Sequence, residues 1–575
     1  MKNTQLQRCI VESIEKKWWK ESVVYQVYPR SFKDTNGDGI GDLKGITEKL
    51  DYIKKLGVDV IWLSPVNKSP NHDNGYDVSD YRDIMDEFGT MEDFNRLMRE
   101  AHARELRIII DLVVNHTSDE HQWFISAGSA KDNPYRDYYF FRPGRSASIP
   151  PNNWKSWFGG SAWEYDKRTG EFYLHLYSKH QPDLNWDNKK VRKEMYDIMR
   201  FWLDKGVDGF RLDIINYISK TAGLPDSNSD DEHRGKEFYL NGPKVHEYLR
   251  EMNEEVFSRY DIVVVGEVED VSPEEARKYV DFDRHELDML LSWEHMYVDY
   301  GKNGTWDIKR WKLKELKNVL SQWQIALDEK GWNAQYLSSH DQPRQVSRFG
   351  DDGRYRIESA KMLATLIHTL KGTPFIYQGE EIGMTNIIFK EINECNDIHS
   401  IRMYNDEIKR GRDRNDLMKI INYRGRDNAR TPMQWTGSKN AGFTEGDPWL
   451  QVNPNYRLIN VDESLENRDS IFYYYMDLIN LRKKNNTIVY GKYKQILEDD
   501  ENIYSYVRSM ENEVILVILN FGQDHCTFTL PEDIKCISCQ LLLSNYEVTD
   551  TSIKRLTLRP YEARVYRLLS HRVKG

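Results

Sequence analysis

One repeating unit constrains what this 575-residue chain can fold into: an amphipathic helical pattern, a short linker, then a brief β-branched run that ends in polar residues. The stretch DLKGITEKLDYIKKLGVDVIWLSPV is typical, because a strand pattern over residues 58–63 follows four apolar residues at helical spacing, Ile46, Leu50, Ile53 and Leu56. The unit recurs in EDFNRLMREAHARELRIIIDLVVNH, VRKEMYDIMRFWLDKGVDGFRLDIIN, GPKVHEYLREMNEEVFSRYDIVVVGE and KMLATLIHTLKGTPFIYQGEE. Such alternation predicts an α/β fold with a parallel sheet covered by helices.

Polar residues follow the predicted strands at the point where each strand ends. In parallel α/β folds the ligand site lies at the carboxyl ends of the strands. A single acid there is explained as well by an ion pair or a cap, but three acids at three strand ends, each beside an Arg or His, indicate a shared site. The residues concerned are Asn115, His116, Arg211, Asp213, Glu267, His340 and Asp341. Paired carboxylates that face one pocket are the equipment for cleaving a glycosidic bond.

Other chemistries lack their motifs in this chain. No GxxxxGK[ST] phosphate loop and no GxSxG nucleophile elbow occurs in the sequence. Lys and Arg total 81 against 92 Asp and Glu, so the mildly acidic balance argues against nucleic acid as a partner. Aromatic residues make up 12% of the chain, and flat rings can cover the apolar faces of sugars, although most aromatics serve packing.

Two segments interrupt the helix–strand rhythm. Residues 116–187 are rich in Trp, Tyr, Asn and Pro without helical period, which predicts a small inserted domain that overhangs the strand ends. From residue 494 to 575 short alternating runs such as EVILVILNF predict an all-β module. The predicted α/β domain therefore comprises residues 17–115 and 188–493, and residues 1–16 read as an extension outside the fold.

The remaining composition indicates a reducing, aqueous location. Five cysteines, with Cys9 and Cys395 far from the rest, do not form a disulfide framework. Cys536 and Cys539 form a CxxC pair without a second ligand pair, so two structural thiols are favoured over zinc. The N-terminal segment shows no apolar run of signal-peptide length, and no stretch has the length of a membrane span. We therefore expect a cytoplasmic protein with no membrane partner.

The segments DLVVNH, GFRLDIIN, VVGE and SHDQ, in this order, resemble the four signature regions of the α-amylase superfamily, glycoside hydrolase family 13. The resemblance extends through WWKESVVYQVYPRSFKDTNGDGIGDLKGI, QPDLNWDN, YQGEEIGMTN and GRDNARTPMQW, and so covers nearly the whole chain from Trp18. Within the superfamily the motifs are similar to the oligo-1,6-glucosidase branch, which includes dextran glucosidases, some α-1,4-glucosidases and sucrose isomerases. The resemblance implies a (β/α)8 TIM barrel with a loop domain after the third strand and a C-terminal β-domain.

The resemblance also assigns roles to the strand-end residues. Asp213 would be the nucleophile, and Arg211 would keep it ionised. Glu267 would be the general acid and then the general base, and Asp341 would stabilise the distorted sugar. Further residues would bind the sugar in the −1 subsite or close that subsite around its non-reducing end, which implies exo action: His116, His340, Asp73, Tyr76 and Arg426.

The loop DTNGDGIGD raises the question of a metal. Its oxygen-bearing residues follow an EF-hand-like order, but Gly45 stands where the bidentate glutamate would be and no helix pair encloses the loop, so a true EF-hand is not expected. A metal-free turn is the alternative. The resemblance implies a structural calcium, with no catalytic role, held by Asp34, Asn36, Asp38, Ile40 and Asp42.

Linkage specificity is less firmly predicted. Ile214 follows the nucleophile, and in the resembled branch a branched aliphatic residue there accompanies α-1,6 substrates, whereas threonine or alanine accompanies α-1,4 substrates. Two departures from the branch weigh against strict α-1,6 preference: residues 268–270 read Val-Glu-Asp in place of Met-Pro-Gly, and His399 stands in place of a glutamate. Sucrose isomerases carry an RLDRD element before the His-Asp motif, whereas the similar charged stretch of this chain, KRGRDRND at 409–416, follows that motif. We therefore interpret this stretch as a solvated helix.

These expectations combine into one predicted function and its alternatives. We expect a retaining exo-α-glucosidase that acts on isomaltose, panose and isomalto-oligosaccharides. Its partners would be small oligosaccharides, and its oligomeric state would be a monomer or a weak homo-oligomer. An α-1,4-glucosidase or a sucrose-acting hydrolase or isomerase of the same branch is the alternative. A catalytically dead binding or assembly subunit is the alternative from another class, but Asp213, Glu267 and Asp341 are all retained.

Overall fold

Parallel strands close into a barrel in the computed structural model, which describes residues 16–534, 536–549 and 552–569. Within these residues eight strands pair in chain order: β1 (Val24–Val27), β2 (Val60–Leu63), β5 (Arg107–Val113), β9 (Gly209–Asp213), β10 (Val263–Val268), β11 (Met289–Ser292), β14 (Ala334–Gln335) and β15 (Thr373–Tyr377). β15 pairs back onto β1, and a parallel bridge from Leu290 to Asn333 joins β11 to the β14 segment. The predicted (β/α)8 barrel is confirmed, whereas the predicted extension lies outside the described residues apart from Lys16.

Helices cover the outside of the barrel because each presents an apolar stripe to the strands. They include α3 (Leu50–Leu56), α4 (Met91–Ala103), α6 (Lys189–Asp204), α7 (Val245–Glu255), α8 (Pro273–Val280), α9 (Leu313–Ala326), α11 (Arg356–Thr369) and α16 (Ile471–Lys483). In α6 the buried residues recur at Val191, Met195, Ile198, Met199 and Trp202, which is the spacing of one helical face. Burial of each such side chain contributes about 1.5–3 kcal/mol. A capping box between Thr90 and Asp93 fixes the start of α4.

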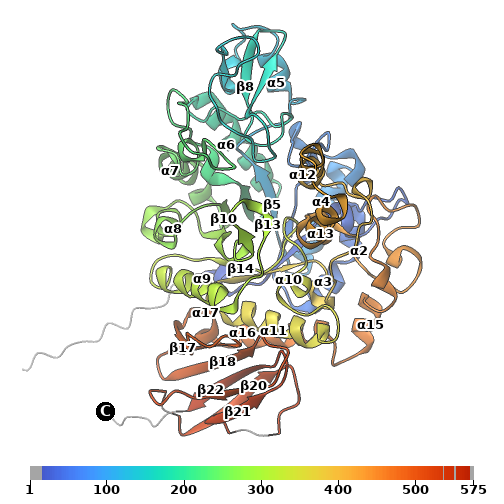
Figure 1. Ribbon diagram of the computed structural model, residues 1–575, viewed down its shortest axis with the longest axis vertical. Helices are drawn as coiled ribbons and strands as arrows, with labels where there is room; N and C mark the ends of the chain where they lie inside the picture. The colour runs from blue at the N-terminus through green and yellow to red at the C-terminus, as the bar shows by residue number, and fades with distance from the viewer. Residues whose placement is uncertain (1–15, 535, 550–551, 570–575) are drawn as a thin grey trace, which may run out of the picture.

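The segment between β5 and α6 forms a separate layer above the barrel. It contains a small antiparallel sheet of β6 (Phe141–Arg142), β8 (Glu171–Leu174) and β7 (Trp163–Asp166). Its buried rings, among them Phe140, Trp154, Trp163 and Phe172, pack with Ile214 and Tyr217 of the barrel. In Figure 1 this segment lies at one end of the molecule, next to the carboxyl ends of the strands.

The C-terminal part of the chain is an antiparallel β-structure at the opposite end of the molecule (Figure 1). In the described part of the chain its larger sheet has the order β16 (Lys492–Ile496), β17 (Ile503–Met510), β18 (Glu513–Asn520), β22 (Ala563–Leu569) and β20 (Ser538–Ser544). A smaller pair joins β19 (Cys526–Thr529) to β21 (Arg555–Leu558). The described cysteines, Cys395, Cys526, Cys536 and Cys539, are not joined in disulfides.

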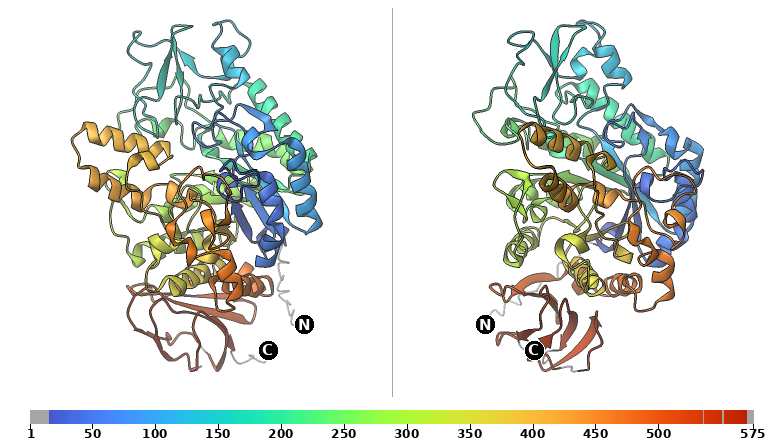
Figure 2. Two further views of the ribbon diagram at one scale, coloured as in Figure 1. Left: turned by 90° about the vertical axis from the view of Figure 1, so that its right-hand side faces the viewer. Right: turned by 45° about the vertical axis from the view of Figure 1, so that its right-hand side comes forward.

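Two helices that follow β15, α12 (Ile398–Lys409) and α13 (Arg414–Arg424), project beside the barrel in Figure 2. The charged stretch 409–416, predicted as a solvated helix, is the end of α12, a turn over residues 410–413 and the start of α13. Gly411 has φ of +85°, a conformation that ends α12 and that other residues adopt only with strain. The stretch is exposed as expected, so the prediction is wrong only in running one helix through residues 410–413.

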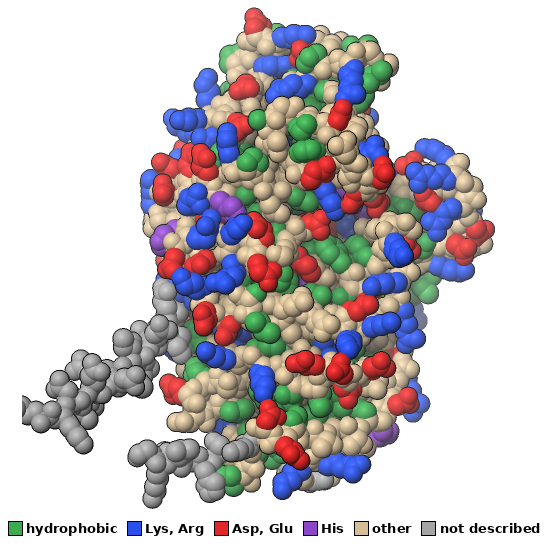
Figure 3. Space-filling view, turned by 60° about the vertical axis from the view of Figure 1, so that its left-hand side comes forward, with side chains coloured by type: hydrophobic (Ala, Val, Ile, Leu, Met, Phe, Trp, Pro, Cys, Tyr) green, Lys and Arg blue, Asp and Glu red, His purple; other side chains and the backbone are tan. Residues whose placement is uncertain are grey.

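The surface carries mixed charge. On the face shown in Figure 3, basic and acidic side chains are interspersed, and the basic ones gather into no extended stripe there of the kind that binds a phosphate backbone. Among the residues that the structure describes, no helix is both long enough and apolar enough to span a bilayer.

A buried arginine ties the barrel to the C-terminal β-structure. Arg508 of β17 is fully buried and donates to the carbonyl oxygens of Thr369 at 2.7 Å, Ile488 at 2.8 Å and Gly491 at 2.6 Å. These carbonyls belong to the end of α11 and to the segment around α17 (Asn486–Tyr490). One guanidinium therefore satisfies carbonyls from two segments and joins both of them to β17.

We predict that Arg508→Met lowers the free energy of unfolding by at least about 3 kcal/mol, because it leaves these buried carbonyls without donors. Urea denaturation followed by tryptophan fluorescence measures the change. Arg567→Met is the matched control, since Arg567 of β22 is 36% exposed and pairs with Glu513 at the surface. Equal loss in the two variants would contradict the role of Arg508.

Candidate active site

The carboxyl ends of the barrel strands open into a pocket of about 1500 Å³ beneath the inserted segment. The side chains predicted for the site converge on it from segments far apart in the chain. Those that line the pocket are Asp73, Tyr76, His116, Asp213, Ile214, Glu267, Asp341 and Arg426. Arg211 and His340 lie behind this wall and contact its residues.

The guanidinium of Arg211 is the centre of a buried ionic cluster. Its Nη1 atom lies 2.6 Å from Asp213 Oδ1 and 2.7 Å from Asp111 Oδ1, and its Nη2 atom lies 2.6 Å from Glu267 Oε1. The side chains of these four residues are at most 10% exposed. The parallel pairing of β5, β9 and β10 places Asp111 and Arg211 in register and brings Asp213 and Glu267 to neighbouring strand ends.

This cluster holds fewer positive charges than carboxyls. Burial raises the pKa of Asp213 and of Glu267, and Arg211 opposes the rise in both. Burial also raises the pKa of Asp111 to about 6, again opposed by Arg211. Because three ionised carboxylates around one guanidinium would leave a net negative charge in a buried site, burial favours a protonated carboxyl in this cluster.

His340 is a neutral hydrogen-bond donor at the pocket wall. Gln26 donates to its Nδ1 atom at 2.7 Å, so the proton resides on Nε2, which lies 2.6 Å from the Tyr76 hydroxyl and 2.8 Å from Asp341 Oδ2. Burial lowers the pKa of His340 to about 4. The Tyr76 hydroxyl in turn donates to Asp111 Oδ2 at 3.0 Å, which links this wall to the Arg211 cluster.

His116 holds a second part of the wall, between the barrel and the inserted segment. Its Nε2 atom lies 3.1 Å from the Tyr76 carbonyl oxygen and 3.2 Å from Gln181 Nε2. Gln181 also donates to Asp73 Oδ2 at 3.2 Å. Burial lowers the pKa of His116 to about 4, so this ring is neutral at physiological pH.

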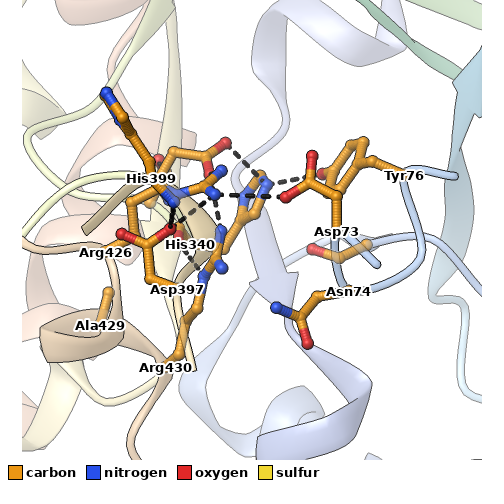
Figure 4. A network of polar contacts seen from close by, with 12 residues as sticks. Asp73, Asn74, Tyr76, His340, Asp397, His399, Arg426, Ala429 and Arg430 are labelled. Atoms are coloured by element: carbon orange, nitrogen blue, oxygen red, sulfur yellow. Dashed lines mark hydrogen bonds and ion pairs between the residues drawn. The ribbon is translucent and has the colours of Figure 1, made fainter. Parts of the chain in front are cut away.

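Arg426 closes the pocket from the side of α14 (Asp427–Arg430). Its guanidinium lies 3.2 Å from Asp73 Oδ1, 3.3 Å from Asp341 Oδ1 and 2.7 Å from Asp397 Oδ1. Figure 4 shows Arg426, Arg430 and Asp397 facing Asp73 and Tyr76, with His340 between the two groups. The pKa of Asp397 is held well below its ordinary value by Arg426, despite the opposing effect of burial.

Ile214 occupies a strained position directly after Asp213. Its φ of +36° and ψ of +47° are left-handed, which costs about 1–3 kcal/mol for a residue other than glycine. Its backbone N–H donates to Glu267 Oε2 at 2.9 Å. The strained turn thus presents an amide to Glu267 while the Ile214 side chain lines the pocket.

Residues at which this sequence departs from the oligo-1,6-glucosidase branch also line the pocket. Glu269 and Asp270 line it, whereas Val268 is buried in β10. Burial raises the pKa of Glu269 to about 8, and the Tyr217 hydroxyl donates to its carboxyl. His399 lines the pocket as well and accepts a hydrogen bond from Trp306 Nε1 at 3.0 Å.

The loop of residues 34–42 folds into successive side-chain turns. Asp34 Oδ1 accepts from the N–H groups of Asn36 and Gly37 at 2.9 and 2.8 Å, Asn36 Oδ1 from that of Asp38 at 2.9 Å, and Asp38 Oδ1 from that of Ile40 at 2.8 Å. Asp42 Oδ2 accepts from Thr35 N at 2.8 Å. The side-chain oxygens are therefore turned onto their own loop, and hard oxygen donors of this kind suit calcium.

Four residues of the site were not predicted from the sequence: Asp111, Gln181, Asp397 and Arg430. Asp111 carried a signal, since an aspartate inside the apolar run IIIDLVV requires a buried partner. Arg430 Nη2 lies 2.9 Å from Asp341 Oδ1 and its Nε donates to the His340 carbonyl. Gln181 and Asp397 stand in loops, where no local pattern distinguishes them from solvated residues.

Comparison with known proteins gives a consistent result. The profile of the α-amylase catalytic domain matches residues 26–491, and that of the maltogenic amylase C-terminal domain matches residues 493–565. The chain is 58% identical over 560 residues to an oligo-1,6-glucosidase of Parageobacillus thermoglucosidasius, covering 96% of this chain and 100% of that one. It is 50% identical to a trehalose-6-phosphate hydrolase of Bacillus subtilis, with 96% and 98% covered. The crystal structure of an isomaltulose synthase from Klebsiella sp. LX3 matches with a TM-score of 0.94 at 45% identity, over 96% of this chain and 100% of that one.

We predict that Arg426→Met destabilises the protein by about 3–5 kcal/mol at pH 7, because it leaves Asp397 buried without its ion-pair partner and Asp341 with Arg430 as its one remaining arginine. Arg426 lowers the pKa of Asp397 and burial raises it, so in the variant burial raises that pKa above the unfolded value of about 4 and the carboxyl takes up a proton as the pH falls. The loss in the variant should therefore shrink towards pH 4.

Denaturation midpoints of the Arg426→Met variant and the unaltered chain across pH 4–8 test this prediction. Arg410→Met is the control, since Arg410 is 74% exposed and pairs with Glu407 at the surface. A pH-independent difference between Arg426→Met and the unaltered protein would refute the electrostatic role.

Proposed function

Because this chain belongs to the α-amylase family of glycoside hydrolases, we propose that it is a retaining, exo-acting α-glucosidase that hydrolyses terminal α-1,6-linked glucose. Isomaltose, panose and isomalto-oligosaccharides would be its substrates. The observation that carries the proposal is the pair Asp213 and Glu267, which share the Arg211 guanidinium at neighbouring strand ends and open into one pocket. The names of the similar proteins, which include several oligo-1,6-glucosidases, support the substrate class.

In the proposed mechanism Asp213 attacks the anomeric carbon of the terminal glucose. The glycosidic C–O bond breaks as Glu267 donates its proton to the leaving oxygen, and an ester to Asp213 forms. Glu267, now ionised, then takes a proton from water, which attacks the anomeric carbon and releases α-glucose. The two inversions at that carbon retain its configuration.

The charge balance of the cluster suits this sequence of steps. One proton on the Asp213–Glu267 pair is what a retaining mechanism requires before the first step, with Glu267 as the acid and Asp213 as the anion. Arg211 contacts both carboxyls, so it can stabilise the negative charge wherever it resides. When Asp213 becomes an ester, the same guanidinium supports the newly ionised Glu267.

The closed end of the pocket supports exo action. Asp73, Asp341 and Arg426 form an ion-paired group, so they would bind hydroxyls of a terminal glucose and leave no room for a further sugar beyond it. His116 is neutral and lines the pocket, where it can hydrogen-bond the same sugar, whereas His340 is neutral behind the wall and positions Asp341 through its Nε2 atom. Asp341 keeps a lowered pKa through His340 and the two arginines against the effect of burial, so it supplies negative charge opposite the developing oxocarbenium ion.

Structural calcium at residues 34–42 is part of the proposal. Asp34, Asn36, Asp38 and Asp42 would contribute side-chain oxygens and Ile40 its carbonyl oxygen. The ion would neutralise carboxylates that otherwise repel one another. The loop lies next to the segment of residues 443–449, since Asp34 N donates to the Phe443 carbonyl and Trp449 N to that of Gly39. Calcium would thus stabilise the contact between two distant segments and take no part in the chemistry.

The product profile on isomaltose, panose, maltose, sucrose and trehalose 6-phosphate tests the proposed function, with the anomer of the released glucose resolved by NMR. We expect α-glucose from isomaltose and panose. Glu267→Gln should lower kcat/KM by about 10²–10⁴-fold, with a smaller loss on an activated aryl α-glucoside that needs no acid. Glu294→Gln, a half-buried acid outside the pocket lining, is the control and should retain most of the activity.

A preference for maltose, or conversion of sucrose to a reducing disaccharide, would show that Glu269 and His399 set a different specificity. Release of β-glucose would overturn the retaining mechanism.

We predict that Ile214→Thr shifts the ratio of kcat/KM for isomaltose over maltose towards maltose by about 10-fold, since a hydroxyl and a methyl group replace the aliphatic wall beside the reacting centre. Steady-state kinetics on both disaccharides give the ratio. Ile214→Val keeps a branched aliphatic side chain and should leave the ratio unchanged. An equal ratio in all three proteins would remove Ile214 as the determinant.

We predict that removing calcium with a chelator lowers the thermal midpoint without changing kcat at 25 °C. A ligand present at 100 times its dissociation constant stabilises by about 2.7 kcal/mol. Restoring calcium should restore the midpoint, whereas magnesium should not. Asp38→Asn should abolish the response, and Asp80→Asn, a matched exposed carboxyl of β4 (Asp80–Ile84), should keep it. A midpoint indifferent to calcium would rule out the site.

A further inference from the structure

A second cluster of metal-ligating side chains lies outside the pocket, at the junction of the barrel and the inserted segment. It consists of His72, Asp119 and His180. Their ligand atoms all lie within 4.8 Å of one another, and among the described residues no other group of three His, Cys, Asp or Glu side chains meets that criterion. None of the three has a part in the mechanism above.

The three side chains come from different segments that the fold has already joined. His72 lies in the loop before β4, Asp119 follows β5, and His180 lies in the return of the inserted segment to the barrel. Asp119 N donates to the His180 carbonyl at 3.0 Å, and Ser118 N donates to the Val78 carbonyl at 2.8 Å. Backbone hydrogen bonds therefore hold the segments of the cluster next to one another.

The geometry leaves ligand capacity unused. The His72 and His180 rings stack with centroids 3.8 Å apart at 12°. His180 Nδ1 lies 2.8 Å from Asp119 Oδ2, but Asp119 Oδ1 is buried and has no hydrogen-bond partner. A buried carboxylate oxygen without a partner is costly, and a cation would remove that cost. The side chains of Asp119 and His180 are 25% and 28% exposed, so an ion can reach them.

We propose that His72, Asp119 and His180 form a binding site for a divalent transition-metal ion, of which Zn²⁺ is the test case. Two imidazoles and one carboxylate are the donor set such ions prefer, whereas Ca²⁺ and Mg²⁺ prefer oxygen donors alone. Ligands about 2.0–2.2 Å from one ion lie up to about 4.2 Å apart, and rotation of one imidazole out of the stack would direct both ring nitrogens at a shared ion. Neutral imidazoles are required, so binding weakens in acid.

The site adjoins the pocket through the sequence neighbours of its histidines. Asp73 follows His72, Gln181 follows His180, and Gln181 Nε2 donates to Asp73 Oδ2 at 3.2 Å. An ion bound by both histidines would fasten together the two segments that carry this contact. Its binding site would therefore connect the inserted segment to the wall of the pocket.

Isothermal titration of the full-length, chelator-treated protein with Zn²⁺ at pH 7.5 tests the proposal. We expect a zinc-binding event that an excess of Ca²⁺ or Mg²⁺ does not block and that raises the thermal midpoint. His72→Asn and His180→Asn should each weaken it by at least about 10-fold. His102→Asn is the matched control, because His102 Nε2 lies 2.8 Å from Asp208 Oδ2 in a His–Asp pair outside the cluster, and it should bind Zn²⁺ as the unaltered chain does.

A second measurement avoids dependence on the folding of the variants. Co²⁺ added to the unaltered protein should give visible absorption bands of a nitrogen- and oxygen-ligated ion, and Zn²⁺ should displace them. Zinc affinity equal in the unaltered protein and in both histidine variants would overturn the proposal. So would zinc binding that survives both histidine variants and is lost in Asp213→Asn, since the ion would then lie at the carboxylates of the pocket.

Discussion

The Arg211 guanidinium determines how charge is arranged throughout the site. It is fully buried, and the cost of burying a cation is offset only because Asp111, Asp213 and Glu267 surround it at 2.6–2.7 Å. The parallel register of β5, β9 and β10 makes this arrangement possible, because it places the four side chains on three adjacent strands. Arg211 and Asp213 therefore stand two residues apart in an apolar strand for an electrostatic reason. Each offsets the cost of burying the other, and the same guanidinium also contacts Glu267.

A second group of buried ion pairs also surrounds one arginine, but loops carry its residues instead of strands. Arg426 joins Asp73, Asp341 and Asp397, which come from three separate connections above the barrel. The barrel thus carries the carboxyls of the proposed mechanism on rigid elements, and the loops supply the end wall that would decide which part of a sugar chain can enter. His340 couples the two groups, since it contacts both Tyr76 and Asp341, and Tyr76 reaches Asp111.

Much of this organisation could be predicted from the sequence, and what could not has physical reasons. Asp213, Glu267 and Asp341 were identified because strand patterns end visibly, and a parallel sheet gathers its strand ends. Asp111 was missed because it was taken as part of the strand interior, although its charge demanded a partner. Gln181 and Asp397 act through contacts between loops, which no local periodicity encodes. The stretch 409–416 was taken for one helix because charge alternation does not show where a helix ends. The left-handed conformation of Gly411 ends α12 within this stretch.

The ion pair between Asp73 and Arg426 spans 353 residues of sequence. During synthesis on the ribosome the barrel strands emerge one after another. Asp73, Asp213 and Glu267 have therefore all left the exit tunnel long before Arg426 does. Until then the end wall of the pocket is missing one of its charges, and Asp341 and Asp397 lack a guanidinium on which they depend. A nascent chain therefore cannot hold a sugar in the finished site, and the same dependence means that a product truncated before α14 would be both unstable and inert.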